Sequence, residues 1–217
     1  MKKIILSEKG KKLLSLYSIM IKNGYKRTDG TYAKNVYNRF QLKKYALTLK
    51  PVFSKFSIKD VLDYGSGGSN WDDTNFDLKN KKSAKDFFEL SKVFYYEPAR
   101  KVNQLRKVDC VICFDVLEHI FIGDLKNVIN HIYAHANKLV ILQIACYDSA
   151  AILPNEENAH VTVRNPDWWK GFIDSLVINY PKISTLLICS IAYNKPKAFN
   201  IWSSKQWIES KYFKINF

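Results

Sequence analysis

Short hydrophobic runs alternate along the chain with amphipathic stretches. Runs rich in Val, Ile, Leu, Phe and Tyr predict buried strands at residues 59–64, 92–97, 108–114 and 138–145. Apolar residues spaced three and four apart predict helices over 83–90, 122–136 and 166–178. Two later runs, 183–193 and 198–203, are joined by NKPK and predict an antiparallel hairpin at a sheet edge. Buried strands that alternate with helices are typical of an α/β fold with a mostly parallel sheet.

The start of the chain has the pattern of helices. Apolar residues between Ser7 and Asn23 follow helical spacing, with Ser7 as the N-cap and Gly24 as the end. A second helix is predicted from Tyr32 to Leu49, ending before Pro51. We therefore expect a helical extension over residues 1–57, followed by an α/β core over residues 58–217.

Charge is distributed unevenly between these two parts. The 217 residues include 34 Lys and Arg and 20 Asp and Glu, a net charge of +14. Residues 1–60 carry 15 bases and 3 acids, so the rest of the chain carries only +2. Lysine outnumbers arginine 29 to 5, although bidentate recognition of phosphate favours arginine. The basic N-terminal segment predicts either a phosphate-binding surface or a solvated helical face.

Several classes of protein are disfavoured by the sequence. No apolar run approaches the roughly 18 residues that a membrane-spanning helix requires. The apolar stretch at the start is too short for the core of a signal peptide. The four cysteines form no regular disulfide framework. Cys110 and Cys113 lie on a predicted strand at an odd separation, so they should point to opposite faces. These features predict a cytoplasmic protein without a membrane span.

A glycine-rich turn follows the first predicted strand of the core. Residues 61–69 read VLDYGSGGS, and the glycines allow a tight turn and a close approach of the backbone to a ligand. A dinucleotide-binding G-x-G-x-x-G motif would require glycine where Asn70 stands. That fingerprint is therefore excluded.

The pattern D-x-G-x-G resembles motif I of the class I S-adenosyl-L-methionine-dependent methyltransferases. Glu97 ends the next strand, where this family places the carboxylate that binds both ribose hydroxyls. Residues 109–120, DCVICFDVLEHI, resemble the family's fourth strand and the turn after it. Together the three motifs cover residues 58–145. The resemblance implies a methyltransferase with a Rossmann-like, mostly parallel seven-stranded sheet, S-adenosylmethionine as cofactor and the basic N-terminal helices as an extension.

The same resemblance implies which residues contact the cofactor. Amides of the glycine loop suit its carboxylate, and Glu97 can accept two hydrogen bonds from the ribose diol. Asp63 would orient the loop or accept from the cofactor's amine. Only 11 residues separate Glu97 from Asp109, so we expect the family's intervening strand to be missing or reduced. The implied cofactor residues are Asp63, Tyr64, Gly65, Ser66, Gly67, Glu97, Pro98, Asp115 and Val116.

Two histidines are candidates for the chemistry. His119 closes the sequence DVLEH, and His160 lies in LPNEENAHV, upstream of Trp168 and Trp169. The second segment resembles the loop LP.G.NAH…WW of a subset of bacterial and phage methyltransferases, with Glu157 in place of glycine. The resemblance implies a position above the cofactor methyl group. His160 is the first candidate for a general base or substrate contact, and His119 is the second. A loop histidine that bonds the backbone is the alternative.

A divalent metal ion is a further hypothesis. Asp115, Glu118 and His119 are spaced i, i+3 and i+4, which would place them on one face of a helix, and His160 could add a fourth ligand. The set resembles E-x-x-E-H with a distant histidine in metal-dependent small-RNA 2′-O-methyltransferases, and a related set in ubiquinone-pathway O-methyltransferases. Because LEH also occurs in methyltransferases without metal, a metal-free site stays open.

The acceptor of the methyl group is not identified by these motifs. A small molecule or a glycan-like compound is the first hypothesis, and RNA held by the basic N-terminal helices is the second. A non-catalytic relative that binds cofactor or a partner is the third. Amino-methylating DNA enzymes are disfavoured because their D/N-P-P-Y/F motif is replaced by Asp115-Val116-Leu117. The family resemblance implies that Tyr32, Tyr37, Arg39 and Phe40 could form part of a lid over the cofactor, and core packing of the aromatic residues is the alternative. The oligomeric state is left open.

Overall fold

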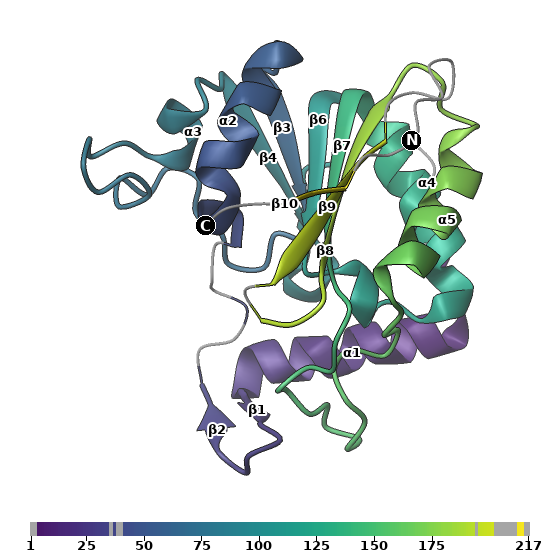
Figure 1. The fold of residues 1–217 in the computed structure, drawn as a ribbon. Coiled ribbons are helices and arrows are strands. Elements are labelled where there is room, and N and C mark those ends of the chain that lie inside the picture. The colour runs from purple at the N-terminus through teal and green to yellow at the C-terminus, as the bar shows by residue number, and fades with distance from the viewer. Residues whose placement is uncertain (1–3, 35–36, 38–40, 194, 202–211, 215–217) are drawn as a thin grey trace.

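A computed structural model describes residues 4–34, 37, 41–193, 195–201 and 212–214. Within these residues the chain forms an α/β fold around one large sheet (Figure 1). Its strands are β3 (Asp60–Tyr64), β4 (Lys92–Glu97), β5 (Val102–Asn103), β6 (Val108–Phe114), β7 (Ala136–Ala145), β8 (Ser184–Ser190), β9 (Pro196–Ile201) and β10 (Tyr212–Lys214). The order across the sheet is β10-β9-β8-β7-β6-β3-β4-β5.

The sheet is mostly parallel, as predicted. Strands β4, β3, β6, β7 and β8 run parallel to one another, whereas β5, β9 and β10 add antiparallel edges. The predicted C-terminal hairpin is formed by β8 and β9. The described sheet has eight strands instead of the seven expected, because β10 continues the edge beyond β9. Where a reduced strand was expected after Glu97, the chain forms only the two-residue β5.

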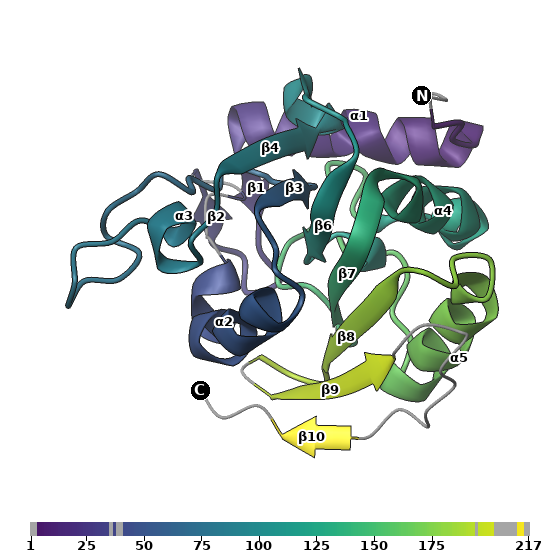
Figure 2. The same cartoon turned by 90° about the horizontal axis from the view of Figure 1, so that it is seen from above.

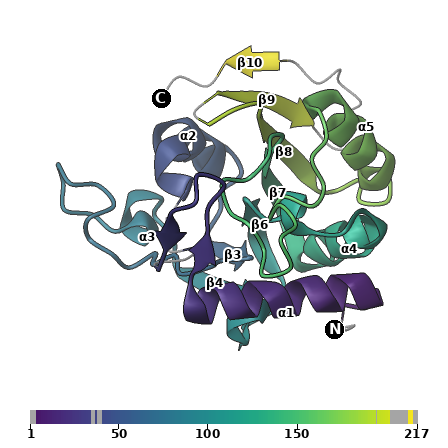
Figure 3. The same ribbon diagram turned by 90° about the horizontal axis from the view of Figure 1, so that it is seen from below.

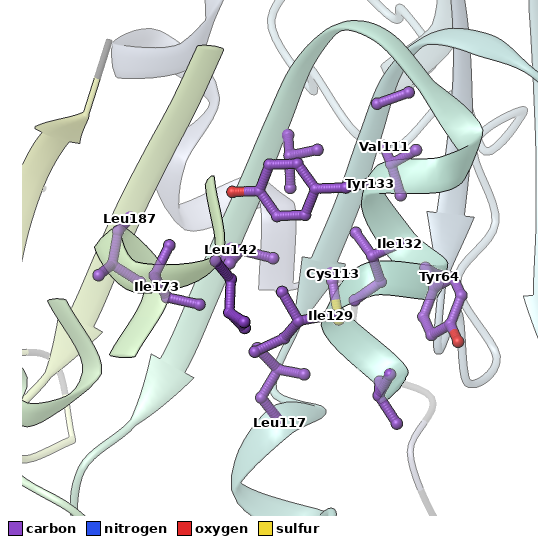
Figure 4. Close-up of a cluster of buried hydrophobic side chains, with 14 of the residues drawn as sticks. Tyr64, Val111, Cys113, Leu117, Ile129, Ile132, Tyr133, Leu142, Ile173 and Leu187 are labelled. Carbon is purple, nitrogen blue, oxygen red and sulfur yellow. The ribbon is translucent and has the colours of Figure 1, made fainter. Parts of the chain in front are cut away.

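Helices cover both faces of the sheet (Figures 1 and 2). One face packs against α4 (Leu125–His135) and α5 (Pro166–Val177), and this cluster is drawn in Figure 4. The other face packs against α2 (Ala46–Lys55) and α3 (Ala84–Phe87). Cys113 belongs to the first cluster and Cys110 to the second, which confirms that the two thiols point to opposite faces.

The first predicted helix is confirmed as α1 (Glu8–Asn23). The hydroxyl of Ser7 accepts a hydrogen bond from the Gly10 amide, and Gly24 ends the helix at φ 91°. Asp124 accepts hydrogen bonds of 2.8 Å from both the amide and the hydroxyl of Ser7. This buried carboxylate therefore fixes the N-terminal end of α1 against the core, and α1 crosses one end of the sheet (Figure 3).

The second predicted helix is wrong. Tyr32 and Ala33 form β2, which pairs with β1 (Tyr25–Lys26). Among the described residues of the predicted helix, helical structure begins with the 3₁₀ helix η1 (Gln41–Tyr45) and continues in α2. Helix α2 continues past Pro51 because Leu49 and Phe53 bury on one side of it. The exposed Pro51 removes one intrahelical hydrogen bond without ending the helix. The boundary at residue 57 between an N-terminal extension and a core stays a prediction. Helix α2 precedes this boundary and packs against the sheet.

The other helices lie close to their predicted positions. Residues 122–136 divide into the 3₁₀ helix η4 (Ile122–Asp124) and α4, while the helix expected at 83–90 is limited to α3. Helix α5 matches its predicted start at Pro166. Among the described residues, no helix combines the length and the apolar character needed to cross a membrane.

Two glycines provide a matched test of the α1 contact. A methyl group at Gly10 would overlap the carboxylate of Asp124, whereas one at Gly171 in α5 would meet none of the described residues within 4 Å. Both sites are helical, so Gly→Ala gains the same helix propensity, up to about 1 kcal/mol. We expect Gly10→Ala to lower the free energy of unfolding by about 1–3 kcal/mol and Gly171→Ala to raise it by about 0.5–1 kcal/mol, measured by urea denaturation. Equal effects of the two changes would show that Asp124 does not hold α1.

Candidate functional site

The three sequence motifs meet where the strand order reverses. Strand β4 lies on one side of β3 and β6 on the other. The chain therefore goes from β3 to β4 on one side and then crosses back to β6 on the other side. In open α/β sheets, ligands bind outside the carboxyl ends of the strands at such a point. The glycine loop follows β3, Glu97 ends β4, and Asp115 follows β6. The sheet therefore collects the candidate cofactor residues at one edge.

The glycine loop depends on glycine at two positions. Gly65 and Gly67 have φ angles of 75° and 54°, in the left-handed region. A Cβ atom on Gly65 would overlap the side chain of Val116, and one on Gly67 would lie 2.5 Å from the carbonyl oxygen of Tyr37. The amide of Gly65 bonds to the carbonyl of Tyr96 at 2.7 Å. These contacts bring the loop against the ends of both β4 and β6.

Glu97 holds the loop through its carboxylate. Its Oε2 accepts from the amide of Gly67 at 2.9 Å, and its Oε1 accepts from the amide of Ala99 at 3.1 Å. Burial raises the pKa of Glu97, whereas these two amides and the nearby Arg100 oppose the rise. Each carboxylate oxygen has more than one acceptor position. Glu97 is thus oriented by the backbone and keeps acceptor capacity for a ligand diol.

Asp63 orients the loop, which is one of the two roles expected for it. Its Oδ2 accepts from the hydroxyl of Ser69 at 2.6 Å and from the indole Nε1 of Trp71 at 2.8 Å. Burial raises the pKa of Asp63 to about 6. Ser69 and Trp71 belong to no motif with known spacing, so the sequence pattern did not predict these contacts. The side chain of Tyr64 lies in the core, where its hydroxyl pairs with Nδ1 of His131 at 3.0 Å.

His119 is held in one tautomer. Its Nδ1 lies 2.8 Å from the carbonyl oxygen of Ala159 and 3.2 Å from the hydroxyl of Tyr17. That hydroxyl donates its own proton to the same carbonyl at 2.6 Å. Both neighbours of Nδ1 therefore accept, so Nδ1 carries the proton and Nε2 keeps its lone pair. Burial lowers the pKa of His119 to about 3, which leaves the ring neutral.

His160 is held in the same way. Its Nδ1 donates to the carbonyl oxygen of Tyr147 at 2.5 Å, and its amide donates to Oδ1 of Asn158 at 2.9 Å. Burial lowers the pKa of His160 as well. The rings of His119 and His160 meet edge to face, with centroids 4.8 Å apart. The backbone bond that was the alternative reading of His160 is present, and it leaves Nε2 as a base.

Glu118 lies beside the two histidines and forms a cluster with them. Its Oε1 accepts from the amide of Ala145 at 2.9 Å, while its buried Oε2 has no hydrogen-bond partner among the described residues. Burial and the neighbouring Asp115 raise the pKa of Glu118 well above its usual range. One ligand atom from each of Glu118, His119 and His160 lies within 4.8 Å of the others. Three of the four predicted metal ligands are therefore brought together.

Asp115 does not share a helical face with them. It adopts a left-handed φ of 52° after β6, and the 3₁₀ helix η3 (Leu117–His119) begins only two residues later. Its amide donates to the carbonyl of Gln143 at 3.0 Å, and its carboxylate bonds the Gln143 side chain. The predicted i, i+3, i+4 arrangement is wrong for this residue, because the chain turns before the helix starts.

Tyr37 connects the glycine loop with the histidines. Its carbonyl accepts from the amide of Gly68 at 2.8 Å, and its ring lies edge-on to His119 with centroids 6.0 Å apart. Tyr17, which also contacts His119, has the helical spacing of a core residue, so no sequence pattern distinguishes it from one. Of the other predicted lid residues, Tyr32 lies in β2, and Arg39 and Phe40 fall outside the described residues.

The two neighbouring tryptophans pack α5. Trp169 is fully buried in the core, and Trp168 stacks on Phe172 with ring centroids 5.0 Å apart. Both tryptophans therefore help to pack α5, the helix that follows the loop containing His160.

Neither a protein-family model, a curated protein nor a solved structure matches this chain. Its function must therefore be inferred from the residues and contacts described above.

The raised pKa of Asp63 predicts a pH dependence of stability. Because the folded pKa of about 6 exceeds the usual value of 3.8, the folded protein binds more protons between these values. Asp63 should then lose about 3 kcal/mol of its contribution to stability as the pH rises through 4 to 7. Asp63→Asn can keep an oxygen acceptor for Ser69 and Trp71 but cannot ionise. We expect the difference in unfolding free energy, wild type minus variant, to fall over this range in urea titrations. A constant difference would contradict the assignment.

Proposed function

We propose that this protein is an S-adenosylmethionine-dependent methyltransferase with the class I, Rossmann-like arrangement. The observation that carries the proposal is the junction of Glu97 with the glycine loop at the point where the strand order reverses. A carboxylate with spare acceptor positions suits a ribose diol, and a loop of left-handed glycines suits the close approach of a ligand carboxylate.

The residues beside this junction have properties that methyl transfer uses. When bound, S-adenosylmethionine supplies an activated methyl group. His160 and His119 are neutral imidazoles with Nε2 free of the backbone bonds. Because burial lowers the pKa of His119 to about 3, its imidazole is a weak base, so we propose His160 as the group that accepts a proton from the nucleophile. Tyr37 and α1 cover the region and would help to exclude water and align the acceptor. We propose a small-molecule or glycan-like acceptor and a cytoplasmic location.

The first test is the binding of S-adenosylhomocysteine, measured by isothermal titration calorimetry. We expect the wild type to bind it and Glu97→Gln to weaken binding by about tenfold or more, since an amide cannot accept from both Gly67 and Ala99 and also from a diol. The exposed Glu89 provides the matched control, because Glu89→Gln removes the same charge outside the site.

Absence of binding by the wild type would overturn the methyltransferase proposal. Equal affinities for the Glu97 and Glu89 variants would remove Glu97 from the site. Binding without methyl transfer to any acceptor would instead favour the non-catalytic relative that the sequence leaves open.

A second candidate is methyl transfer to a hydroxyl with help from a divalent cation. It is favoured by the buried Oε2 of Glu118, which has no hydrogen-bond partner in the described part of the chain and lies beside two imidazoles whose Nδ1 atoms bond backbone carbonyls. Bonds of this kind orient histidine ligands in metal sites. Two nitrogens and one carboxylate oxygen suit Zn²⁺, Mn²⁺ or Fe²⁺. A cation held there would lower the pKa of an acceptor hydroxyl. An RNA ribose is one such acceptor, and the basic N-terminal segment would then hold its phosphates.

The cation hypothesis predicts a pH-dependent site. Because burial keeps the pKa of Glu118 high, a cation has to displace its proton, so the affinity should rise with pH. Co²⁺ titration, followed by its visible absorption, should show bound imidazole in the wild type. We expect Glu118→Gln to weaken binding about tenfold or more and to remove most of the pH dependence. The exposed Glu157 supplies the control variant Glu157→Gln. The absence of absorption bands, or equal affinity for both variants, would contradict the cation hypothesis and leave His119 and His160 as two metal-free imidazoles.

A further inference from the structure

A groove lies outside the cluster of histidines. It opens between the C-terminal end of α1, the β1–β2 hairpin and residues 152–156, and it encloses about 600 Å³. Figure 3 shows the three segments side by side at one end of the molecule. Volumes of this order suit a small ligand. The described lining includes the apolar Met20 and Leu153, the aromatic Tyr25 and Tyr32, and the basic Lys26 and Arg27.

The exposed ring of Tyr32 is held in place. The side chain is 58% exposed, yet its hydroxyl donates to the carbonyl of Asn23 at 2.5 Å. Gly24 makes this position accessible, because a Cβ atom there would lie 2.8 Å from the Tyr32 ring. An aromatic ring that is fixed but exposed offers a rigid face for stacking. The hairpin is therefore built to present this ring to the groove.

The basic residues give the groove an anion-binding character. Lys26 is exposed, and the half-buried Arg27 approaches Asp29 only loosely, at 3.8 Å. Glu156 is the one acid among the described lining residues, so the lining carries a net charge of +1, and Asp29 beside Arg27 lies outside the lining. Arginine and lysine at the rim of an aromatic pocket match a ligand that carries phosphate. Glu156 also interrupts the basic rim, which disfavours a long polyanion that tracks the surface.

The loop that lines the groove also carries His160. The amide of Leu153 bonds to the carbonyl of Glu157 at 2.8 Å, and the amide of Ala159 bonds to the carbonyl of Ala151 at 3.0 Å. The loop therefore folds back on itself, with Leu153 against the groove and His160 directly after Ala159. On the other wall, Tyr25 stacks on Tyr37, which in turn contacts His119. Both walls thus continue into the histidine cluster.

We propose that this groove binds a phosphorylated ring of the methyl acceptor, with the ring against Tyr32 and the phosphate near Lys26 and Arg27. This inference rests on the proposed methyltransferase function and names the chemistry of its substrate. A nucleoside monophosphate and a sugar phosphate share that chemistry. The part of the acceptor that receives the methyl group would extend along the loop toward His160.

The test uses the full chain with four probes: uridine monophosphate, glucose 1-phosphate, uridine and inorganic phosphate. Binding is measured by ligand-observed NMR, with S-adenosylhomocysteine affinity measured separately on the same samples. We expect at least one phosphorylated ring to bind about tenfold more tightly than either phosphate or uridine alone. Preference for uridine monophosphate would identify a base as the ring, and preference for glucose 1-phosphate a sugar.

Variants locate the binding. We expect Lys26→Gln and Tyr32→Leu each to weaken binding about fivefold or more. Lys12→Gln should leave it unchanged, since Lys12 is an exposed α1 lysine that does not line the groove. Circular dichroism checks that the variants fold. Normal S-adenosylhomocysteine binding without binding of either phosphorylated ring would overturn this inference and leave the proposed function intact.

Three other results are decisive. Equal affinities for all three variants would place the ligand elsewhere and overturn the inference. A short single-stranded RNA that binds about 100-fold more tightly than the monophosphate, with a steep salt dependence, would replace it with an RNA site. Binding of a phosphorylated ring that depends on Lys26 and Tyr32, without S-adenosylhomocysteine binding, would support the groove while overturning the methyltransferase.

Discussion

The bond between the Glu97 carboxylate and the Gly67 amide determines how the candidate site is assembled. It joins the end of β4 to the loop after β3, and a second bond to Ala99 prevents the carboxylate from turning away. The loop can make this contact only because Gly67 adopts a left-handed backbone that side chains disfavour. Val116, after β6, then packs where Gly65 has no side chain. Three strand ends are fixed relative to one another by these contacts.

Buried acids are a second common feature of this edge. Asp63, Glu97 and Glu118 each accept hydrogen bonds from backbone, hydroxyl or indole donors, and burial raises the pKa of all three. Such groups retain acceptor capacity that a ligand with hydroxyl groups, an amine or a positive charge could use. The basic excess of the chain lies instead in residues 1–60, which include the β1–β2 hairpin. The two ends of the proposed acceptor path therefore differ in charge.

Much of the sheet follows directly from local sequence pattern. The strands at 92–97 and 108–114 match their predicted bounds because continuous apolar runs have no alternative to burial between helices. The single helix predicted from Tyr32 to Leu49 was wrong because its aromatic residues fit helical spacing by coincidence, whereas Tyr32 lies in a hairpin and Tyr45 in a 3₁₀ helix. Short edge strands such as β5 and β10 depend on pairing partners distant in sequence, which local pattern does not report.

The candidate site was predictable where it depends on motifs. The glycine loop, Glu97 and the pairing of His119 with His160 follow strand order, which brings successive carboxyl ends together. Contacts that cross between elements were not predictable. Trp71 on Asp63, Tyr17 on His119 and the Tyr147 carbonyl on His160 are set by packing in three dimensions. The position of Asp115 was not predictable either, because its own left-handed backbone conformation places it outside the expected helix.

We propose that Glu97 and the glycine loop form a cofactor site, and a crystal structure grown with S-adenosylhomocysteine is the decisive test. The ribose hydroxyls should lie within hydrogen-bond distance of the Glu97 carboxylate, and the amino-acid end should lie against the loop at Gly65 to Gly67. Its sulfur should face the side on which His119 and His160 lie. Electron density for the ligand at any other place, with the Glu97 carboxylate contacting only Gly67 and Ala99, would contradict it.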